Sequence, residues 1–246
     1  MESLYDVCAR KDLDILYLSG VSFFDTEELK EKYSAFAGGN YLRKGEYTEP
    51  LNGPDMLVRL QENKDYIMSA CLQIVRREFL LEHQIAFYEG IIHEDNIFTF
   101  QTLLLAERVF CIKEVFFNRR VREDSIMTRA VSHKNLYGYF CCLLQNTAAA
   151  GKKQLTEKQR TAVILVLKNL RTQVVNIRSE LPEQELDAFY ERCSLYERLQ
   201  FDVYLDSGAE IRRITNSATF RIGSAVLWPM RVLKNVMLRI KKALKR

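Results

Sequence analysis

The residues best suited to chemistry form one short stretch, in which His93 is followed by the adjacent acids Glu94 and Asp95. An apolar approach and Gly90 precede this stretch, and an amphipathic run follows it from Ile97 onward. The pattern predicts a turn that places both carboxylates at the start of a helix, where the amide dipoles favour negative charge. Adjacent side chains diverge, so each acid can have its own role. As a purely structural acid at a helix start, Asp95 would contribute about 0.5–2 kcal/mol.

A second cluster is basic: Arg119, Arg120 and Arg122 precede Ser125 in a segment that we predict to be a turn. Guanidinium groups suit bidentate binding of phosphate oxygens, and a serine hydroxyl can add a further hydrogen bond. A solvated basic turn, neutralised by the acids at positions 123 and 124, explains the same residues equally well. Both interpretations stay open at the level of the sequence.

Three stretches together carry a family resemblance: Arg76-Arg77-Glu78-Phe79-Leu80, then residues 85–95, then residues 120–127. In combination and at this spacing they resemble the acceptor half of bacterial family 2 glycosyltransferases with the GT-A fold. The resemblance covers roughly residues 1 to 130. It implies an inverting transfer of a sugar from a nucleotide-sugar donor to a glycan or cell-surface acceptor, as in cell-surface polysaccharide biosynthesis.

The same resemblance implies roles for individual residues. Asp95 corresponds to the general base that takes the proton from an acceptor hydroxyl. Glu94 would orient Asp95 or hydrogen-bond the acceptor sugar, and His93 would line the same cleft. The family also has a stretch that closes over the donor diphosphate, which here contains Arg120, Arg122 and Ser125.

A complete enzyme of this family is expected to use Mg or Mn, held by a D-x-D motif in its nucleotide-binding half. Asp12-Leu13-Asp14 matches that string, but it stands before a predicted strand, whereas the metal motif belongs at a strand's exit. We therefore predict that the D-x-D ligands are absent and that the chain is an N-terminally truncated form of the enzyme. The alternative is a non-catalytic fragment or an interaction or membrane-binding module. A metal-dependent phosphohydrolase is disfavoured, because the chain has only three histidines.

The hydrophobic periodicity predicts an α/β fold followed by an all-α C-terminal extension. The resemblance implies that the α/β part is a partial GT-A-like mixed sheet with flanking helices. Strands are expected over residues 13–24, 67–76 and 109–117, and a loop or lid over 37–54. Helices are expected over residues 1–10, 27–36, 52–63, 77–83, after the Glu94-Asp95 turn, and over 136–150, 155–179 and 182–205. The predicted domains are the acceptor-side half at 1–130, a helical bundle at 131–210 and a basic amphipathic tail at 211–246.

Charge is unevenly distributed along the 246 residues. The net charge is +4, but residues 211–246 hold ten Lys or Arg and no acid, so the preceding part carries −6. In the tail an apolar helical face alternates with basic residues, which predicts binding to an anionic membrane surface. Nucleic acid is disfavoured as a partner, because the tail has almost no aromatic residues for base stacking.

The cellular location follows from the cysteines and the ends of the chain. The six cysteines show no C-x-x-C pair or repeat spacing, which is typical of reduced thiols in a cytoplasmic protein. No signal-peptide pattern opens the sequence. Together with the basic tail, these features predict a cytoplasmic protein that is peripheral to the inner face of the cell membrane.

Overall fold

The computed structural model describes residues 2–123, 125, 128–203 and 205. The chain divides into two compact units, Met1–Arg192 and Cys193–Arg246. The first unit extends past the predicted boundary at residue 130. None of the helices in the described part combines the length and the hydropathy that a membrane span requires. The predicted basic tail, residues 211–246, lies outside the described residues.

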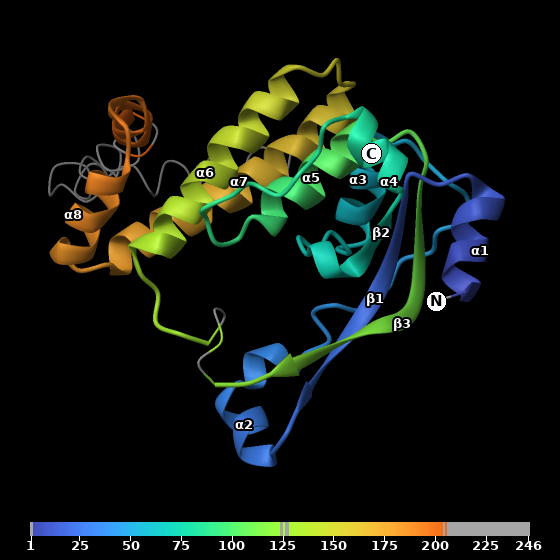
Figure 1. Ribbon diagram of the computed structural model, residues 1–246, viewed down its shortest axis with the longest axis horizontal. Helices are drawn as coiled ribbons and strands as arrows, with labels where there is room; N and C mark the ends of the chain where they lie inside the picture. The colour runs from blue at the N-terminus through green and yellow to red at the C-terminus, as the bar shows by residue number, and fades with distance from the viewer. Residues whose placement is uncertain (1, 124, 126–127, 204, 206–246) are drawn as a thin grey trace, which may run out of the picture. The chain divides into compact units, whose positions relative to one another are not determined.

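The first unit contains a three-stranded mixed sheet with the order β2-β1-β3 (Figure 1). The central strand β1, Ile15–Phe24, pairs antiparallel with β2, Gln73–Val75, and parallel with β3, Val109–Val121. Its first residues, Ile15 to Tyr17, are almost fully buried. The sheet and its flanking helices confirm the predicted α/β class.

Helices surround this sheet in an order close to the predicted one. Asn52 caps α3 by accepting a hydrogen bond from the Asp55 amide, and Thr26 caps α2 in the same way through the Leu29 amide. The helices of the first unit are α1 Glu2–Lys11, α2 Glu27–Lys32, α3 Gly53–Glu62, α4 Arg77–Glu82, α5 Asp95–Leu105, α6 His133–Gly151, α7 Glu157–Glu180 and α8 Glu183–Arg192, with 3-10 turns at Ser34–Phe36 and Ala70–Leu72.

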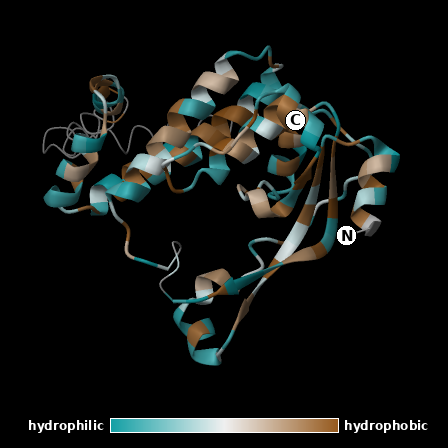
Figure 2. Ribbon diagram, viewed as in Figure 1, coloured by the Kyte–Doolittle hydropathy of each residue, from teal (hydrophilic) through white to brown (hydrophobic). Residues whose placement is uncertain are grey.

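The main core lies between these helices and one side of the sheet. Helix α5 is its centre: eight of its eleven residues are buried, and it contacts α3 and α6. Helix α7 packs on both α3 and α6, so the predicted C-terminal helices share a core with the preceding part of the chain. Figure 2 shows hydrophobic residues along α5 and along β1.

The predicted strand at 67–76 was wrong in extent, because only Gln73–Val75 forms a strand. Beyond Tyr17 the neighbouring edge of β1 is taken by the loop before α3. There the Gly20 amide donates to the Tyr41 carbonyl, and the Arg43 side chain donates to the Leu18 carbonyl. Residues 67–72 therefore have no strand partner and form a turn instead.

The predicted end of the third strand at Phe117 was also wrong. Strand β3 continues to Val121, because its pairing with β1 continues in register to Phe24. The basic segment that we predicted to be a turn is therefore strand up to Val121.

The predicted single helix over 182–205 is interrupted. Helix α8 ends at Arg192, and a new helical segment begins after Ser194. Ser194 and Glu197 form a reciprocal cap: the Ser194 amide and hydroxyl donate to the Glu197 carboxylate, and the Glu197 amide donates to the Ser194 hydroxyl. This cap starts the described part of the second unit.

Candidate functional site

The acidic stretch is a turn that leads directly into α5, as the sequence predicts. Gly90 and His93 both adopt positive φ angles, +77° and +70°, and Glu94 is the N-cap residue. Asp95 is the first residue of the helix. The Glu94 side chain makes no capping hydrogen bond, so this carboxylate is not committed to the helix start.

Helix α6 holds the turn in place from the other side. The Ile92 carbonyl lies against Gly138, where a Cβ atom would come within 2.2 Å of its oxygen. The Cys142 thiol donates a hydrogen bond to the main-chain carbonyl of His93 at 3.3 Å. The side-chain amide of Asn146 donates to the main-chain carbonyl of Asn96, also at 3.3 Å. The position of the two acids therefore depends on a helix about 40 residues further along the chain.

Two contacts hold the His93 side chain, one at the face of its ring and one at a ring nitrogen. The imidazole stacks on Tyr139 with ring centroids 4.2 Å apart, and its Nε2 lies 3.2 Å from the Asn135 side-chain amide. Burial lowers the pKa of His93, although the Glu94 carboxylate opposes this shift. The lowered pKa favours a neutral imidazole, which packs against the Tyr139 ring.

The electrostatics of Asp95 differ from those of an ordinary helix-start acid. Burial, reinforced by the neighbouring Glu94 carboxylate, raises the pKa of Asp95 to about 6. Hydrogen bonds from Asn96 and from the backbone at the helix start act in the opposite direction, but they are weaker than burial here. A structural acid at a helix start would have its pKa lowered. A buried carboxyl that titrates near neutrality is typical of functional sites.

Two tyrosines and one glutamine lie near Asp95, and the two tyrosines were not predicted from the sequence. Burial raises the pKa of Tyr66 and of Tyr139, and the Asp95 carboxylate adds to both shifts. Gln73 donates to Thr99 on α5, one turn beyond Asp95, at 3.4 Å. Within the described residues the Tyr66 hydroxyl and the Gln73 carbonyl oxygen are buried without a hydrogen-bond partner. These two atoms are available to form hydrogen bonds with water or with a ligand.

The predicted phosphate-binding residues lie at the far end of β3. Arg120 is exposed and forms an ion pair with Asp25 at 2.6 Å, and Arg122 is exposed just beyond the strand. The Ser125 hydroxyl lies 3.0 Å from that of Thr128. Figure 1 shows β3 running away from α5 toward α2, so the structure does not bring these residues into contact with the acidic turn.

The neighbouring Arg119 is part of the fold itself. Its guanidinium donates to the Tyr41 hydroxyl and lies over the Phe36 ring, 4.6 Å from the centroid. These contacts attach the end of β3 to the segment between α2 and α3.

Asp12-Leu13-Asp14 has the structural role expected of a strand-leading turn. The Asp14 carboxylate accepts the Arg76 guanidinium at 2.6 Å and the amides of Glu107 and Arg108 at 2.8 and 3.0 Å. These donors satisfy the buried carboxylate and leave no geometry for a metal. Among the residues that the structure describes, no group of three or more His, Cys, Asp or Glu is arranged to hold a metal ion.

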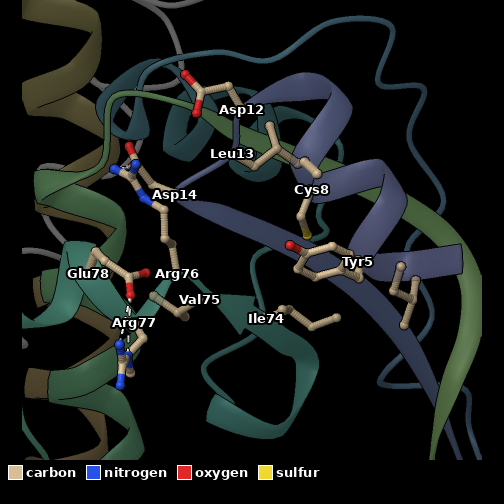
Figure 3. Close-up of a pocket in the computed structure, with 12 residues that line it drawn as sticks. Tyr5, Cys8, Asp12, Leu13, Asp14, Ile74, Val75, Arg76, Arg77 and Glu78 are labelled. Atoms are coloured by element: carbon tan, nitrogen blue, oxygen red, sulfur yellow. Dashed lines mark hydrogen bonds and ion pairs between the residues drawn. The ribbon is translucent and has the colours of Figure 1, made fainter. Parts of the chain in front are cut away.

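A pocket of about 700 Å³ lies at this end of the sheet, between α1 and β2 (Figure 3). Its walls are largely apolar, from Leu4, Tyr5 and Cys8 on one side and Ile74 and Val75 on the other. The Asp14–Arg76 ion pair lies at its polar end. Asp95 does not line this pocket.

No family model matches the chain, and no curated protein matches it either. Among solved structures it is similar to residues 1–349 of TarS from S. aureus, a glycosyltransferase. With the UDP-GlcNAc complex of TarS it shares 18% identity and a TM-score of 0.49, over 83% of this chain and 52% of that one. With the structure of TarS alone it shares 14% identity and a TM-score of 0.43, over 83% of this chain and 50% of that one. The chain spans about half the length of these structures, and similarity at this level leaves its function to be argued from its own residues.

Proposed function

We propose that the chain is the acceptor-side half of an inverting glycosyltransferase of the bacterial family 2 type. The observation that carries this proposal is the Asp95 carboxyl, whose pKa is raised to about 6 by burial at the start of α5. Within the described residues Asp95 forms no ion pair that would explain it as a structural acid. A base with this pKa is ionised at neutral pH and retains enough basicity to accept a proton from a hydroxyl.

The reaction that fits this base is attack of an acceptor oxygen on the anomeric carbon of a nucleotide-sugar. The bond from that carbon to the nucleoside diphosphate breaks on the opposite face, and the acceptor proton passes to Asp95. Glu94, which no capping hydrogen bond occupies, would orient the acceptor through a hydroxyl. The glycan acceptor would lie on the α5 side, with Tyr66 and Gln73 as further hydrogen-bonding groups.

The leaving diphosphate needs positive charge. Arg120, Arg122 and Ser125 are the residues proposed for this role, but they lie at the far end of β3, away from the acidic turn. The proposal therefore requires that this segment moves toward Asp95 when the donor binds and that the Arg120–Asp25 ion pair opens. The family's Mg or Mn has no fitting ligand set among the described residues, since Asp14 is fully occupied by Arg76 and two amides. We propose that the metal's ligands and the donor nucleotide site are supplied by a separate nucleotide-binding half.

The test of this proposal is transfer by the chain fused behind the nucleotide-binding half of a family 2 enzyme. Asp95→Asn should lower the turnover at least 100-fold, because general-base assistance contributes about 10²–10⁴. Donor binding should be retained. The exposed Glu89 provides a matched control, and Glu89→Gln should keep full turnover. If the Asp95→Asn fusion and the unchanged fusion have equal turnover, Asp95 is not the general base.

The proposed location is the inner face of the cytoplasmic membrane, reached through the basic tail. Its support is the charge pattern of residues 211–246 alone. Flotation with vesicles of anionic lipid, with and without residues 229–246, tests this part separately. Deletion of residues 229–246 should abolish binding to the vesicles. Equal vesicle binding with and without these residues would rule out the membrane proposal.

A second candidate is an interaction module without catalysis, and the pocket in Figure 3 favours it. Strand β2 is only three residues long and has one strand neighbour in the described sheet. A strand from another polypeptide could pair with its outer edge and fill the adjoining apolar pocket. Co-migration with a separately produced nucleotide-binding half would test this, with Ile74→Asp expected to abolish it. Retained co-migration of that variant would count against this surface.

A further inference from the structure

Phe87 is a surface aromatic ring supported from one side. Its side chain is 49% exposed, and its ring is stacked on that of Phe98 with centroids 4.3 Å apart and an angle of 12° between the planes. Because Phe98 covers one face, the exposed part of Phe87 includes the opposite face. Tyr88, the next residue, is also exposed, at 38%.

The Phe87 ring is held in place by well-packed parts of the fold. Phe98 is 7% exposed and belongs to α5, the central helix of the core. The loop that carries Phe87 is anchored before it by Ile85, which packs on that core. After Phe87 the loop is anchored at Gly90, whose carbonyl accepts a hydrogen bond from Arg192 of α8. A ring held in this way loses little conformational entropy when a ligand stacks on it.

Phe98, on which the Phe87 ring stacks, shares a helix face with the proposed base. Phe98 follows Asp95 by three residues, and residues three apart are neighbours on one helix face. Thr99, four residues after Asp95, lies on the other side of the same face and receives the hydrogen bond from Gln73. The Asp95 position is therefore flanked by an aromatic ring on one side and an amide on the other.

The charge of this loop restricts the kind of ligand. Residues 84–95 contain three carboxylates, Glu89, Glu94 and Asp95, and no Lys or Arg. Phosphate groups would be repelled here, which disfavours a nucleotide. A neutral molecule with hydroxyl groups for the carboxylates and a flat apolar face for the ring matches both features.

We propose that Phe87 is the stacking platform of the acceptor subsite and takes the C–H face of a neutral pyranose ring. The sugar lies on Phe87 and directs a hydroxyl toward Asp95. This inference rests on the proposed function, since it names the substrate class of the same site. It also excludes an acyclic polyol as the preferred acceptor unit, because such a chain has no flat ring face.

The test is a titration of the full chain, observed through its backbone amide NMR signals. The probes are the methyl β-glycosides of glucose, galactose and N-acetylglucosamine, with glucitol as the acyclic comparison. At least one glycoside should shift the signals of residues 85–98, and Phe87→Ala should weaken its binding about two- to twelvefold, which corresponds to 0.5–1.5 kcal/mol for an aromatic stack. Glucitol should bind at least about fivefold more weakly than that glycoside.

Two variants complete the design. Phe116→Ala removes an aromatic ring of nearly equal exposure, 45%, from β3 and should leave glycoside binding unchanged. Phe87→Tyr keeps the stacking face and should retain the affinity. The proposal that Phe87 is a stacking platform would be overturned by any one of three results. These are no signal shift at residues 85–98 with any glycoside, equal binding of glucitol and the glycoside, or an unchanged affinity in Phe87→Ala.

The result is separable from the test of the reaction. If Phe87→Ala loses binding while Asp95→Asn of the fusion keeps its turnover, the platform stands and the base assignment fails. If Asp95→Asn loses turnover while Phe87→Ala binds normally, the base stands and the platform fails.

Discussion

Gly138 of α6 packs against the main-chain carbonyl of Ile92 so closely that a Cβ atom at position 138 would lie 2.2 Å from the carbonyl oxygen. This contact is backbone on backbone, so neither side can give way by rotating a side chain. It lets α6 approach the turn that precedes Glu94 and Asp95. The positioning of the two acids is therefore a tertiary feature, set by a helix that lies outside the stretch carrying the family resemblance.

Substitution of Gly138 tests this relationship. Gly138→Ala should destabilise the fold by about 1–3 kcal/mol, the usual range for forcing a group into a packed interface. Urea unfolding measures the loss. Gly151→Ala is the matched control in the same helix, because a Cβ atom there meets nothing within 4 Å. Alanine has the higher helix propensity, so the control should be neutral or slightly stabilising. Equal stability of the two variants would mean that α6 does not hold the turn.

Local signals in the sequence account for most of the elements. Thr26, Asn52 and Thr156 are residue types that favour helix starts, and each accepts a hydrogen bond from the amide three residues later. The start of α5 at Asp95 was predicted in the same way. These features depend on neighbours within four residues, so they can be predicted without knowledge of the fold.

The errors in two strands come from contacts between distant segments, whereas the break in the helix predicted over 182–205 is a local cap at Ser194. Residues 67–72 have the composition of a strand, but Tyr41 and Arg43 occupy the edge of β1 that they would need. The end of β3 looks like a turn by composition and remains a strand through its pairing with β1. For the site, the acids were visible in the sequence, whereas Tyr66 and Tyr139 come close to Asp95 only through the packing of other segments.

The raised pKa of Asp95 predicts a stability that depends on pH. The folded-state pKa of about 6 lies above the ordinary value of 3.8, so the folded protein binds this proton more tightly than the unfolded chain. The contribution is fully present below about pH 4 and is lost as the pH rises through 6. Asp95→Asn should therefore be more stable than the unchanged protein by roughly 1–3 kcal/mol at pH 7.5.

At pH 3.5 the difference between these two proteins should vanish, because the carboxyl is then protonated in both states. Urea unfolding at the two pH values measures it, and Glu89→Gln serves as the exposed control with no expected change. A stability gain that is the same at both pH values would mean that charge burial is not its cause.

The two acids of Asp12-Leu13-Asp14 should respond very differently to substitution. Asp14 is 6% exposed and accepts hydrogen bonds from Arg76 and from two amides, so Asp14→Asn should destabilise the fold by about 2–4 kcal/mol. Asp12 has a positive φ of 50°, which Asn tolerates well, so Asp12→Asn should change stability by less than about 0.5 kcal/mol.

A metal titration separates this structural role from a D-x-D site. Mn²⁺ should not stabilise the unchanged protein against heat, and neither variant should alter that result. Stabilisation by Mn²⁺ that disappears in both variants would establish the pair as metal ligands and would contradict the hydrogen-bonding account of Asp14.

Asp65 organises the predicted loop or lid at 37–54. Its carboxylate, 1% exposed, accepts hydrogen bonds from the Lys44 and Gly45 amides and from the Tyr47 hydroxyl, at 2.7 to 2.9 Å. Its main-chain carbonyl accepts the buried Arg43 guanidinium at 2.6 Å. This segment is therefore fixed at its middle, and a large lid movement around residues 43–47 would require breaking a buried charged network.

Asp65→Ala should consequently destabilise the protein by about 3–5 kcal/mol, because the Lys44 and Gly45 amides and the Tyr47 hydroxyl lose their charged acceptor. Hydrogen exchange of the amides at 43–47 should rise by at least about tenfold. Glu46→Ala is the control in the same loop, since its ion pair with Lys113 is exposed and contributes less than about 1 kcal/mol. If exchange at 43–47 is already fast in the unchanged protein, the network does not hold the loop, and a lid in this segment becomes the better interpretation.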